Sequence, residues 1–163
     1  MIHFIKHDVT KTTFGVVAHG CNCQGVMGSG VALAIRQRWP QVYKRYQEFV
    51  AAYRKDHHPD MSGLLGTQQI INVTEPAMMQ NSLFVANLFT QVFYGGDGKK
   101  YADLDAVTRS LETTLAFCKG SALPLYLPRI GCGLGGLSWD KEVGPALAGL
   151  VEKYDVDVYV CDL

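Results

Sequence analysis

Short apolar runs alternate along the chain with longer segments whose apolar side chains recur every three or four residues. The runs predict strands, because a strand covered on both faces needs no polar side. The spaced segments predict amphipathic helices. The expected strands cover residues 3–5, 14–18, 68–73, 83–89, 123–127 and 156–161. The expected helices cover residues 31–39, 40–54, 104–119 and a segment from about residue 138.

Prolines, glycines and capping residues set the expected ends of the helices. Pro40 stops the first helix and suits the first position of the second. Asp103 is a natural N-cap for the third helix, and Gly120 is expected to end it. The last helix begins near Ser138, where Pro145 predicts either a kink or a later start.

The alternation of strands and helices predicts the α/β class, with helices on both faces of a largely parallel sheet. The chain of 163 residues shows no linker, repeat or low-complexity segment, so we expect a single domain over residues 1–163. Residues 55–60 and 91–101 are predicted to be loops. The glycines within Gly95–Gly98 favour a mobile surface segment.

Composition narrows the class of protein. An apolar content of 48% with 18% charged residues argues against disorder. The formal net charge of zero disfavours non-specific binding to duplex nucleic acid through phosphate neutralisation. Five scattered cysteines favour a reducing compartment over a disulfide framework. Because the sequence shows neither a signal peptide nor a membrane-spanning run, we expect a cytoplasmic protein.

Two glycine-rich loops carry the candidate chemistry, and each joins an expected strand to an expected helix. They cover residues 19–30 and 128–136. A helix N-terminus offers unpaired amides and a favourable dipole to an anion, and glycines let the backbone approach it. Both loops are expected to meet at the carboxyl edge of the sheet. They predict a site for an extended anion such as a diphosphate; the alternative is that the glycines only make tight turns.

Familiar motifs of other classes do not account for these loops. Gly131, Gly133 and Gly136 match G-x-G-x-x-G, but the chain continues for only one strand, so a full dinucleotide-binding domain is not expected. A Walker motif is excluded because Gly-Lys-Ser/Thr does not occur. Cys21 and Cys23 lack the second pair that structural zinc needs, so we predict neither a metal ion nor a cofactor.

Three polar side chains near the loops each have a functional and a structural interpretation. Asp8 follows the first strand, where its carboxylate can accept a hydrogen bond from an exocyclic amine or close a turn on its own backbone. His19 can be a general acid or phosphate clamp, or a structural histidine. Asn22 can orient a ribose hydroxyl or a water, or cap a turn. The residues alone leave these alternatives open.

Taken together, VVAHGCNCQGVMGSGVALA and LPRIGCGLGGLSW resemble the signature loops of macrodomains, in the branch of the ADP-ribose 1″-phosphate phosphatases. Close relatives of that branch are the terminal ADP-ribose protein glycohydrolases and the antitoxins that reverse DNA ADP-ribosylation. The resemblance covers nearly the whole chain. It implies a three-layer α/β/α fold with a mixed, largely parallel central sheet and an ADP-ribose-binding cleft on its crest.

The resemblance also implies roles for individual positions. Asp8 would meet the adenine amine, and the backbone at Val9 would meet the ring edge. Cys21 and Asn22 would both belong to the substrate-binding residues, and Asn22 would lie by the distal ribose. Two groups of loop residues would hold phosphate from opposite sides: Gly28, Ser29, Gly30 and Val31 from one, and Ile130, Gly131, Cys132, Gly133, Leu134 and Gly135 from the other.

One departure bears on the reaction. The glycohydrolase branch uses a lysine just after the strand expected at residues 83–89, helped in its protein-directed members by an aspartate in the second loop. Those positions look like Gln91 and Gly135 here. Glutamine cannot form the covalent adduct that a lysine amine forms. Lys99 and Lys100 lie in the neighbouring loop and are poor substitutes by position.

We therefore predict an enzyme that removes phosphate from ADP-ribose 1″-phosphate. His19 and Asn22 would orient the terminal phosphate or the attacking water, and loop amides would stabilise the developing charge. One alternative is a non-catalytic module that recognises ADP-ribose. Another is hydrolysis of an ADP-ribosyl group on modified protein or nucleic acid through a positioned water. Nucleic acid is expected as a partner only where it carries ADP-ribose.

Overall fold

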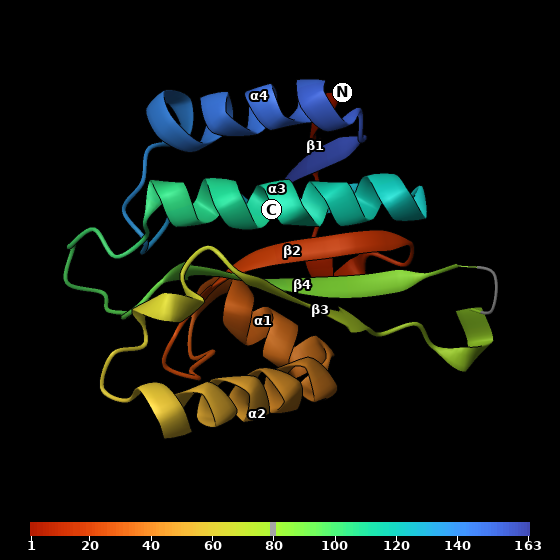
Figure 1. Cartoon of the computed structure of the whole chain (residues 1–163). Coiled ribbons are helices and arrows are strands. Elements are labelled where there is room, and N and C mark those ends of the chain that lie inside the picture. Colours follow the sequence, from red (N-terminus) through yellow and green to blue (C-terminus); the bar gives the residue numbers. More distant parts are fainter. Residues whose placement is uncertain (79–80) are drawn as a thin grey trace.

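The computed structural model describes residues 1–78 and 81–163, which form three layers (Figure 1). The strands of the central sheet are β1 (Ile2–Lys6), β2 (Gly15–Asn22), β3 (Gln68–Asn72), β4 (Leu83–Gln91), β5 (Leu125–Leu127) and β6 (Val158–Asp162). The α-helices are α1 (Gly30–Arg38), α2 (Pro40–His57), α3 (Leu104–Ser121) and α4 (Gly144–Tyr154).

The strands lie in the order β1-β6-β5-β2-β4-β3. Every neighbouring pair is parallel except β3 and β4, which are antiparallel. The predicted mixed, largely parallel sheet is therefore confirmed. Because β2, β4 and β5 are parallel to one another, their carboxyl ends reach the same edge of the sheet, and the segments that follow them are brought together there.

Helices cover both faces of the sheet, with α3 and α4 on one and α1 and α2 on the other (Figure 1). The side chains of β2 alternate between these faces, as a strand requires. Val16 and Ala18 belong to the core under α3 and α4, whereas Val17 and Cys21 belong to the core under α1 and α2. The predicted α/β class with two helical layers is confirmed.

Two helices run past their predicted ends. Helix α2 includes His57, so the loop predicted for residues 55–60 begins too early. The ring of His57 stacks on that of Tyr53 one turn earlier, with ring centroids 3.8 Å apart. This contact favours continuation of the helix to His57. Helix α3 continues through Gly120 to Ser121, and its C-cap Ala122 takes the left-handed conformation with φ of 55°. The prediction that Gly120 ends this helix was wrong, because Ala122 takes the left-handed cap conformation that glycine usually supplies.

The last helical segment begins in two steps. Its first turn is a π-helix over Trp139–Val143, capped by the Ser138 hydroxyl, which accepts a 3.2 Å hydrogen bond from the Lys141 amide. Helix α4 follows directly, with Pro145 in its first turn. Of the two alternatives predicted for this proline, the later start is confirmed, since a missing N–H costs nothing in a first turn.

Two negative findings apply to residues 1–78 and 81–163. No helix there combines the length and the apolar character needed to cross a membrane. No three side chains of His, Cys, Asp or Glu gather there in an arrangement that could hold a metal ion.

Candidate functional site

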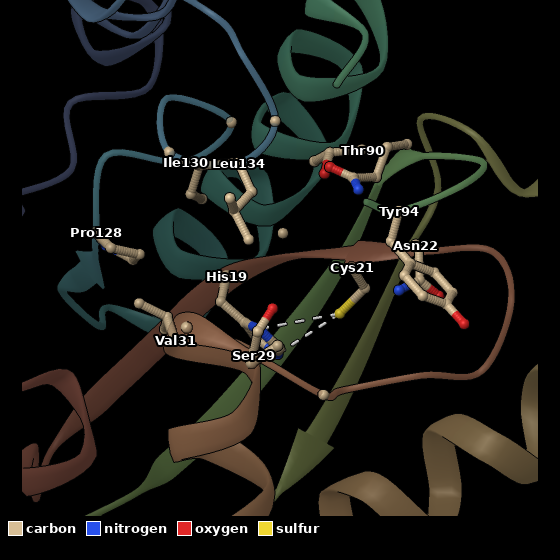
Figure 2. A pocket seen from close by; sticks show the side chains of 18 of the residues that line it. His19, Cys21, Asn22, Ser29, Val31, Thr90, Tyr94, Pro128, Ile130 and Leu134 are labelled. Atoms are coloured by element: carbon tan, nitrogen blue, oxygen red, sulfur yellow. Dashed lines mark hydrogen bonds between the residues drawn. The ribbon is translucent and has the colours of Figure 1, made fainter. Parts of the chain in front are cut away.

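A cleft of about 810 Å³ opens at the carboxyl edge of the sheet (Figure 2). Its floor is formed by the ends of β2 and β4. One wall is the loop that leads into α1, with Ser29 and Val31, and the facing wall is the loop after β5, with Ile130 and Leu134. The prediction that both glycine-rich loops meet at one edge is confirmed.

Most of the predicted site residues line this cleft. They are His19, Cys21, Asn22, Gly28, Ser29, Gly30, Val31, Ile130, Gly131, Gly133, Leu134 and Gly135. Asp8, Val9 and Cys132 lie outside the lining. The Cys132 thiol donates a 3.4 Å hydrogen bond to the Ile130 carbonyl of its own loop. The structure thus brings together the predicted phosphate-binding loops but leaves the predicted adenine contacts outside the cleft itself.

The first wall presents the uncapped start of α1. Ser29 stands at the N-cap with extended backbone, and its side chain makes no capping hydrogen bond. Within the described residues, the N–H groups of Gly28, Ser29, Gly30 and Val31 have no acceptor. A Cβ added to Gly30, whose φ is 58°, would meet no heavy atom within 4 Å. Gly30 therefore borders open space, and the four N–H groups, which lack internal acceptors, can donate to an anion.

The second wall is folded so that its carbonyls are used internally. The Gly131 carbonyl accepts from Leu137 N at 2.8 Å, and the Gly135 carbonyl accepts from the amides of residues 101 and 102 at 3.0 and 2.9 Å. By contrast, the N–H groups of Gly133, Leu134 and Gly135 find no acceptor in the described part of the chain. A run of unpaired donors beside the cleft is the arrangement that binds anions in other proteins.

The polar floor of the cleft belongs to a strand rather than a loop. His19 and Asn22 were predicted to lie in the first glycine-rich loop, but β2 extends through both and pairs with β4 as far as Gln91. The prediction was wrong because the ladder with β4 stabilises an extended backbone beyond the apolar run. Both side chains are therefore held on a rigid element, with 1% and 8% of their surfaces exposed.

His19 is buried and neutral. Its Nε2 lies 2.6 Å from Oδ1 of Asn87, the residue beside it on β4. Burial lowers the pKa of His19 to about 4, although the hydrogen bond with Asn87 opposes the shift. Near neutral pH the imidazole carries no charge, so it can accept a proton but cannot clamp a phosphate by its charge.

The side chain of Asn22 organises the loop that follows it. Its Nδ2 donates to the Val26 carbonyl at 2.8 Å, and its Oδ1 accepts from Gln24 N at 2.9 Å and from the Tyr46 hydroxyl at 2.8 Å. The structural alternative weighed for Asn22 is thus present. Tyr46 ties α2 to this corner of the cleft, a contact that the sequence did not reveal.

Asp8 also forms the turn that its structural alternative predicts. Its Oδ1 accepts from the Thr10 amide at 2.9 Å and from the Thr10 hydroxyl at 2.6 Å. The hydrogen bonds from Thr10 lower the pKa of Asp8 below its ordinary value, so the carboxylate is ionised near neutral pH. An ionised carboxylate remains able to accept a further hydrogen bond.

Charged side chains near the cleft are paired with one another. Arg129, which lines the cleft, donates from Nε and from an Nη to the two oxygens of Asp162 at 2.9 and 3.0 Å. Lys99 lies 3.8 Å from an Asp97 oxygen and Lys100 lies 3.2 Å from a Glu142 oxygen. The lining, as far as the structure describes it, contains no lysine.

The two positions that match the catalytic pair of the glycohydrolase branch are occupied differently here. Gln91 lines the cleft, and its Nε2 donates to the Phe93 carbonyl at 2.7 Å. A Cβ on Gly135 would lie 2.7 Å from the Gly131 carbonyl oxygen and 2.9 Å from the Ala102 Cβ. The second loop therefore has no room for an aspartate side chain without moving its backbone.

The end of β4 contributes residues that the sequence analysis did not propose. Thr90 is buried, and Tyr94, with 54% of its surface exposed, stands at the mouth of the cleft beside Gly95 and Gly96. Pro128 and Arg129 also contribute to the lining. The sequence could have indicated the residues at the end of β4, because a strand that runs parallel to β2 must end at the same edge of the sheet.

The buried histidine makes stability depend on pH. Since the pKa of His19 is about 4 when folded and near 6.5 when unfolded, the unfolded chain binds the extra proton as pH falls through this window. We expect the free energy of unfolding to fall from pH 7 to pH 4.5 by about 2 kcal/mol more than in His19→Gln. Urea unfolding at both pH values measures the difference. Equal losses in both proteins would show that His19 is not held neutral.

Fold and site together define a three-layer α/β/α domain with an amide-walled cleft at the carboxyl edge of its sheet. The sequence pattern of the family described as Macro domain matches residues 18–144, and the chain belongs to this family. The predicted fold and family are thereby confirmed.

Relatives and solved structures agree with this assignment. A Debaryomyces hansenii protein named ADP-ribose 1″-phosphate phosphatase is 30% identical over 185 aligned positions, which cover 99% of this chain and 100% of the relative. A macrodomain protein from Streptomyces coelicolor has a TM-score of 0.76 at 26% identity, covering 100% and 99% of the two chains. Thermosipho africanus DarTG, solved in complex with ADP-ribose, has a TM-score of 0.78 at 19% identity, covering 98% of this chain and 41% of the other.

Proposed function

We propose that the protein hydrolyses ADP-ribose 1″-phosphate to ADP-ribose and inorganic phosphate. The observation that carries the proposal is the pair of facing walls whose backbone N–H groups lack acceptors among the described residues. Such donors bind phosphate oxygens and stabilise the charge that develops during phosphoryl transfer. The name of the Debaryomyces hansenii relative gives independent support for this substrate.

The roles of the site residues follow from the geometry and the resemblance. The walls at Gly28–Val31 and Ile130–Gly135 hold the phosphates. His19, neutral and on the cleft floor, accepts a proton from the attacking water. Asn22 keeps the first loop in the shape that the substrate requires. The adenine contacts of Asp8 and of the Val9 backbone extend the site beyond the cleft.

The lining argues against a lysine-dependent glycohydrolase. Gln91 carries no nucleophilic amine, and Gly135 leaves no space for an assisting carboxylate. Lys99 and Lys100 are engaged with acidic partners outside the lining. Phosphate removal requires neither group, because a water attacks the phosphorus and the sugar oxygen leaves with a proton.

A second candidate is a module that binds ADP-ribose without turning it over. Two observations favour it: the Asn22 side chain is used to hold its own loop, and the His19 ring is almost fully buried. In this interpretation neither side chain is free to take part in chemistry. The amide walls would still bind ADP-ribose. The two candidates differ only in turnover, which is directly measurable.

The test is phosphate release from ADP-ribose 1″-phosphate by the purified protein, compared with His19→Gln. Glutamine can still donate to Asn87 but cannot accept a proton. We expect kcat to fall by about 10²-fold in His19→Gln, while KM and the affinity for ADP-ribose stay close to those of the parent protein.

Calorimetry with ADP-ribose separates the outcomes. Tight binding with no phosphate release by the parent protein would establish the binding module instead. A parallel loss of binding and turnover in His19→Gln would make His19 a structural residue. Absence of ADP-ribose binding by a folded protein would reject both candidates.

A further inference from the structure

A row of polar side chains crosses three strands on the sheet face that α1 and α2 cover. His19 on β2 is paired in register with Asn87 on β4, and Asn87 is paired with Gln69 on β3. The His19 Nε2 lies 2.6 Å from Asn87 Oδ1, and Asn87 Nδ2 donates to Gln69 Oε1 at 3.2 Å. Asn87 is fully buried, so it must satisfy its amide within this row.

The last member of the row, Gln69, determines which atom of each side chain donates and which accepts. Gln69 Nε2 donates to the main-chain carbonyl of Arg45 in α2 at 3.1 Å. A carbonyl can only accept, so the Gln69 amide nitrogen must face it and the Gln69 oxygen must face Asn87. The Asn87 nitrogen then faces Gln69, and the Asn87 oxygen faces His19. Because that oxygen is also only an acceptor, the proton of neutral His19 must be on Nε2.

We infer that Asn87 and Gln69 are positioning residues that hold His19 as the Nε2-protonated tautomer, with Nδ1 as the nitrogen that keeps its lone pair. The order of donors and acceptors along the row is set at the Arg45 carbonyl of α2, which contacts Gln69 on β3. The tautomer follows from the hydrogen bonds alone, and its consequence for turnover rests on the proposed function.

Cys21 is a second neighbour of the His19 ring. Its Sγ lies 3.9 Å from His19 Nδ1 and 3.6 Å from Nε2. Burial raises the pKa of the Cys21 thiol, so the thiol keeps its proton near neutral pH. Both sulfur contacts are far longer than the 2.6 Å between His19 Nε2 and Asn87 Oδ1, so Asn87 and not Cys21 determines which ring nitrogen carries the proton.

This tautomer determines which atom of His19 takes part in the proposed hydrolysis. The water oxygen forms a bond to phosphorus, and one water proton passes to Nδ1. The bond from phosphorus to the C1″ oxygen breaks, and that oxygen keeps the electron pair. The imidazolium then returns the proton to the C1″ oxygen, so His19 ends as it began.

The tautomer is measured without substrate, from the ring nitrogen shifts of His19 in the ¹⁵N-labelled full chain. We expect a protonated Nε2 and an unprotonated Nδ1 at pH 7. In Gln69→Leu the Asn87 amide is free to turn over, so the two nitrogen shifts should move toward each other as both tautomers become populated. Gln68→Leu is the matched control, because its side chain points to the opposite face of the sheet and should leave the shifts unchanged.

Asn87→Leu removes the partner of Nε2 itself and gives a stronger form of the same test. Because Asn87 is buried and this variant can fail to fold, the half-buried Gln69 carries the decisive measurement. A protonated Nδ1 in the parent protein, or unchanged His19 shifts in folded Gln69→Leu, would overturn the inference.

The kinetic arm separates this inference from the proposed function. In phosphate release, Gln69→Leu should lower kcat roughly twofold with KM unchanged, since part of the protein then carries the proton on the wrong nitrogen. If the parent protein shows the assigned tautomer but releases no phosphate, the positioning by Asn87 and Gln69 stands and the proposed reaction fails.

Discussion

Gly133→Val is expected to weaken ADP-ribose binding by at least about tenfold, or about 1.4 kcal/mol, while the protein stays folded. Gly133 lines the second wall, has no positive φ, and a Cβ built on it would meet no heavy atom within 4 Å. Because the added Cβ meets open space beside the cleft, the valine side chain should occupy room that the proposed phosphate site needs. Isothermal titration calorimetry with ADP-ribose measures the loss.

Gly149→Val is the matched control for this variant. Gly149 is exposed on α4, outside the cleft lining, and its added Cβ would also meet no heavy atom within 4 Å. Both variants should melt within a few degrees of each other. An affinity in Gly133→Val equal to that of the control would show that this wall does not contact the ligand.

Phe89→Ala is expected to lower the free energy of unfolding by about 3–5 kcal/mol. Phe89 is fully buried on β4, directly before the residues that reach the cleft floor. Its ring stacks with those of Tyr46 and Phe49 of α2, with centroids 5.9 and 5.7 Å away. The smaller side chain loses these contacts and leaves a cavity that the rigid sheet cannot close. Urea unfolding monitored by circular dichroism measures the change.

Phe49→Ala tests whether burial or ring stacking dominates. Phe49 makes the same kind of stack on Phe89 but has 40% of its surface exposed. We expect its loss to cost about 1 kcal/mol, in line with the smaller area removed from water. Equal costs for the two variants would contradict the assignment of Phe89 to the packed core between sheet and helices.

The parts of the fold that follow from local periodicity could be predicted from the sequence. The stripe of Leu104, Val107, Leu111 and Leu115 defines α3, and its last three members are fully buried as a core-facing stripe should be. The meeting of the two glycine-rich loops also followed, since parallel strands end at one edge. The antiparallel direction of β3 had no local signal, because its pairing with β4 depends on the path of the connection between them.

The site was less predictable where it depends on contacts between distant residues. His19 and Asn87 are 68 positions apart, and only their register across β2 and β4 joins them. The extension of β2 through Asn22 has the same origin, because Gly20, Cys21 and Asn22 do not form an apolar pattern. A polar residue inside a strand is accepted there because the neighbouring strand supplies its partner.

Two alternatives that the sequence left open are now described in atomic terms. Asp8 closes a turn onto Thr10, and Asn22 caps the loop through Gln24 and Val26. In both cases the short-range hydrogen bond is present, as expected for residue types that compete for nearby backbone groups. Their contacts with a ligand stay predictions, since a carboxylate or amide can accept more than one hydrogen bond.

Main-chain donors in both walls have a consequence for how this molecule can change over evolutionary time. Every residue except proline carries an N–H, so replacing Ser29 or Leu134 alters the bulk at the rim but not the donor itself. Gly131, with its φ of 78°, is different, because a side chain there would strain the backbone that aims the donors. Selection would therefore act on the backbone shape of the walls more than on the charge of their side chains. Substitutions could change ligand specificity while the main-chain donors that bind an anion are retained.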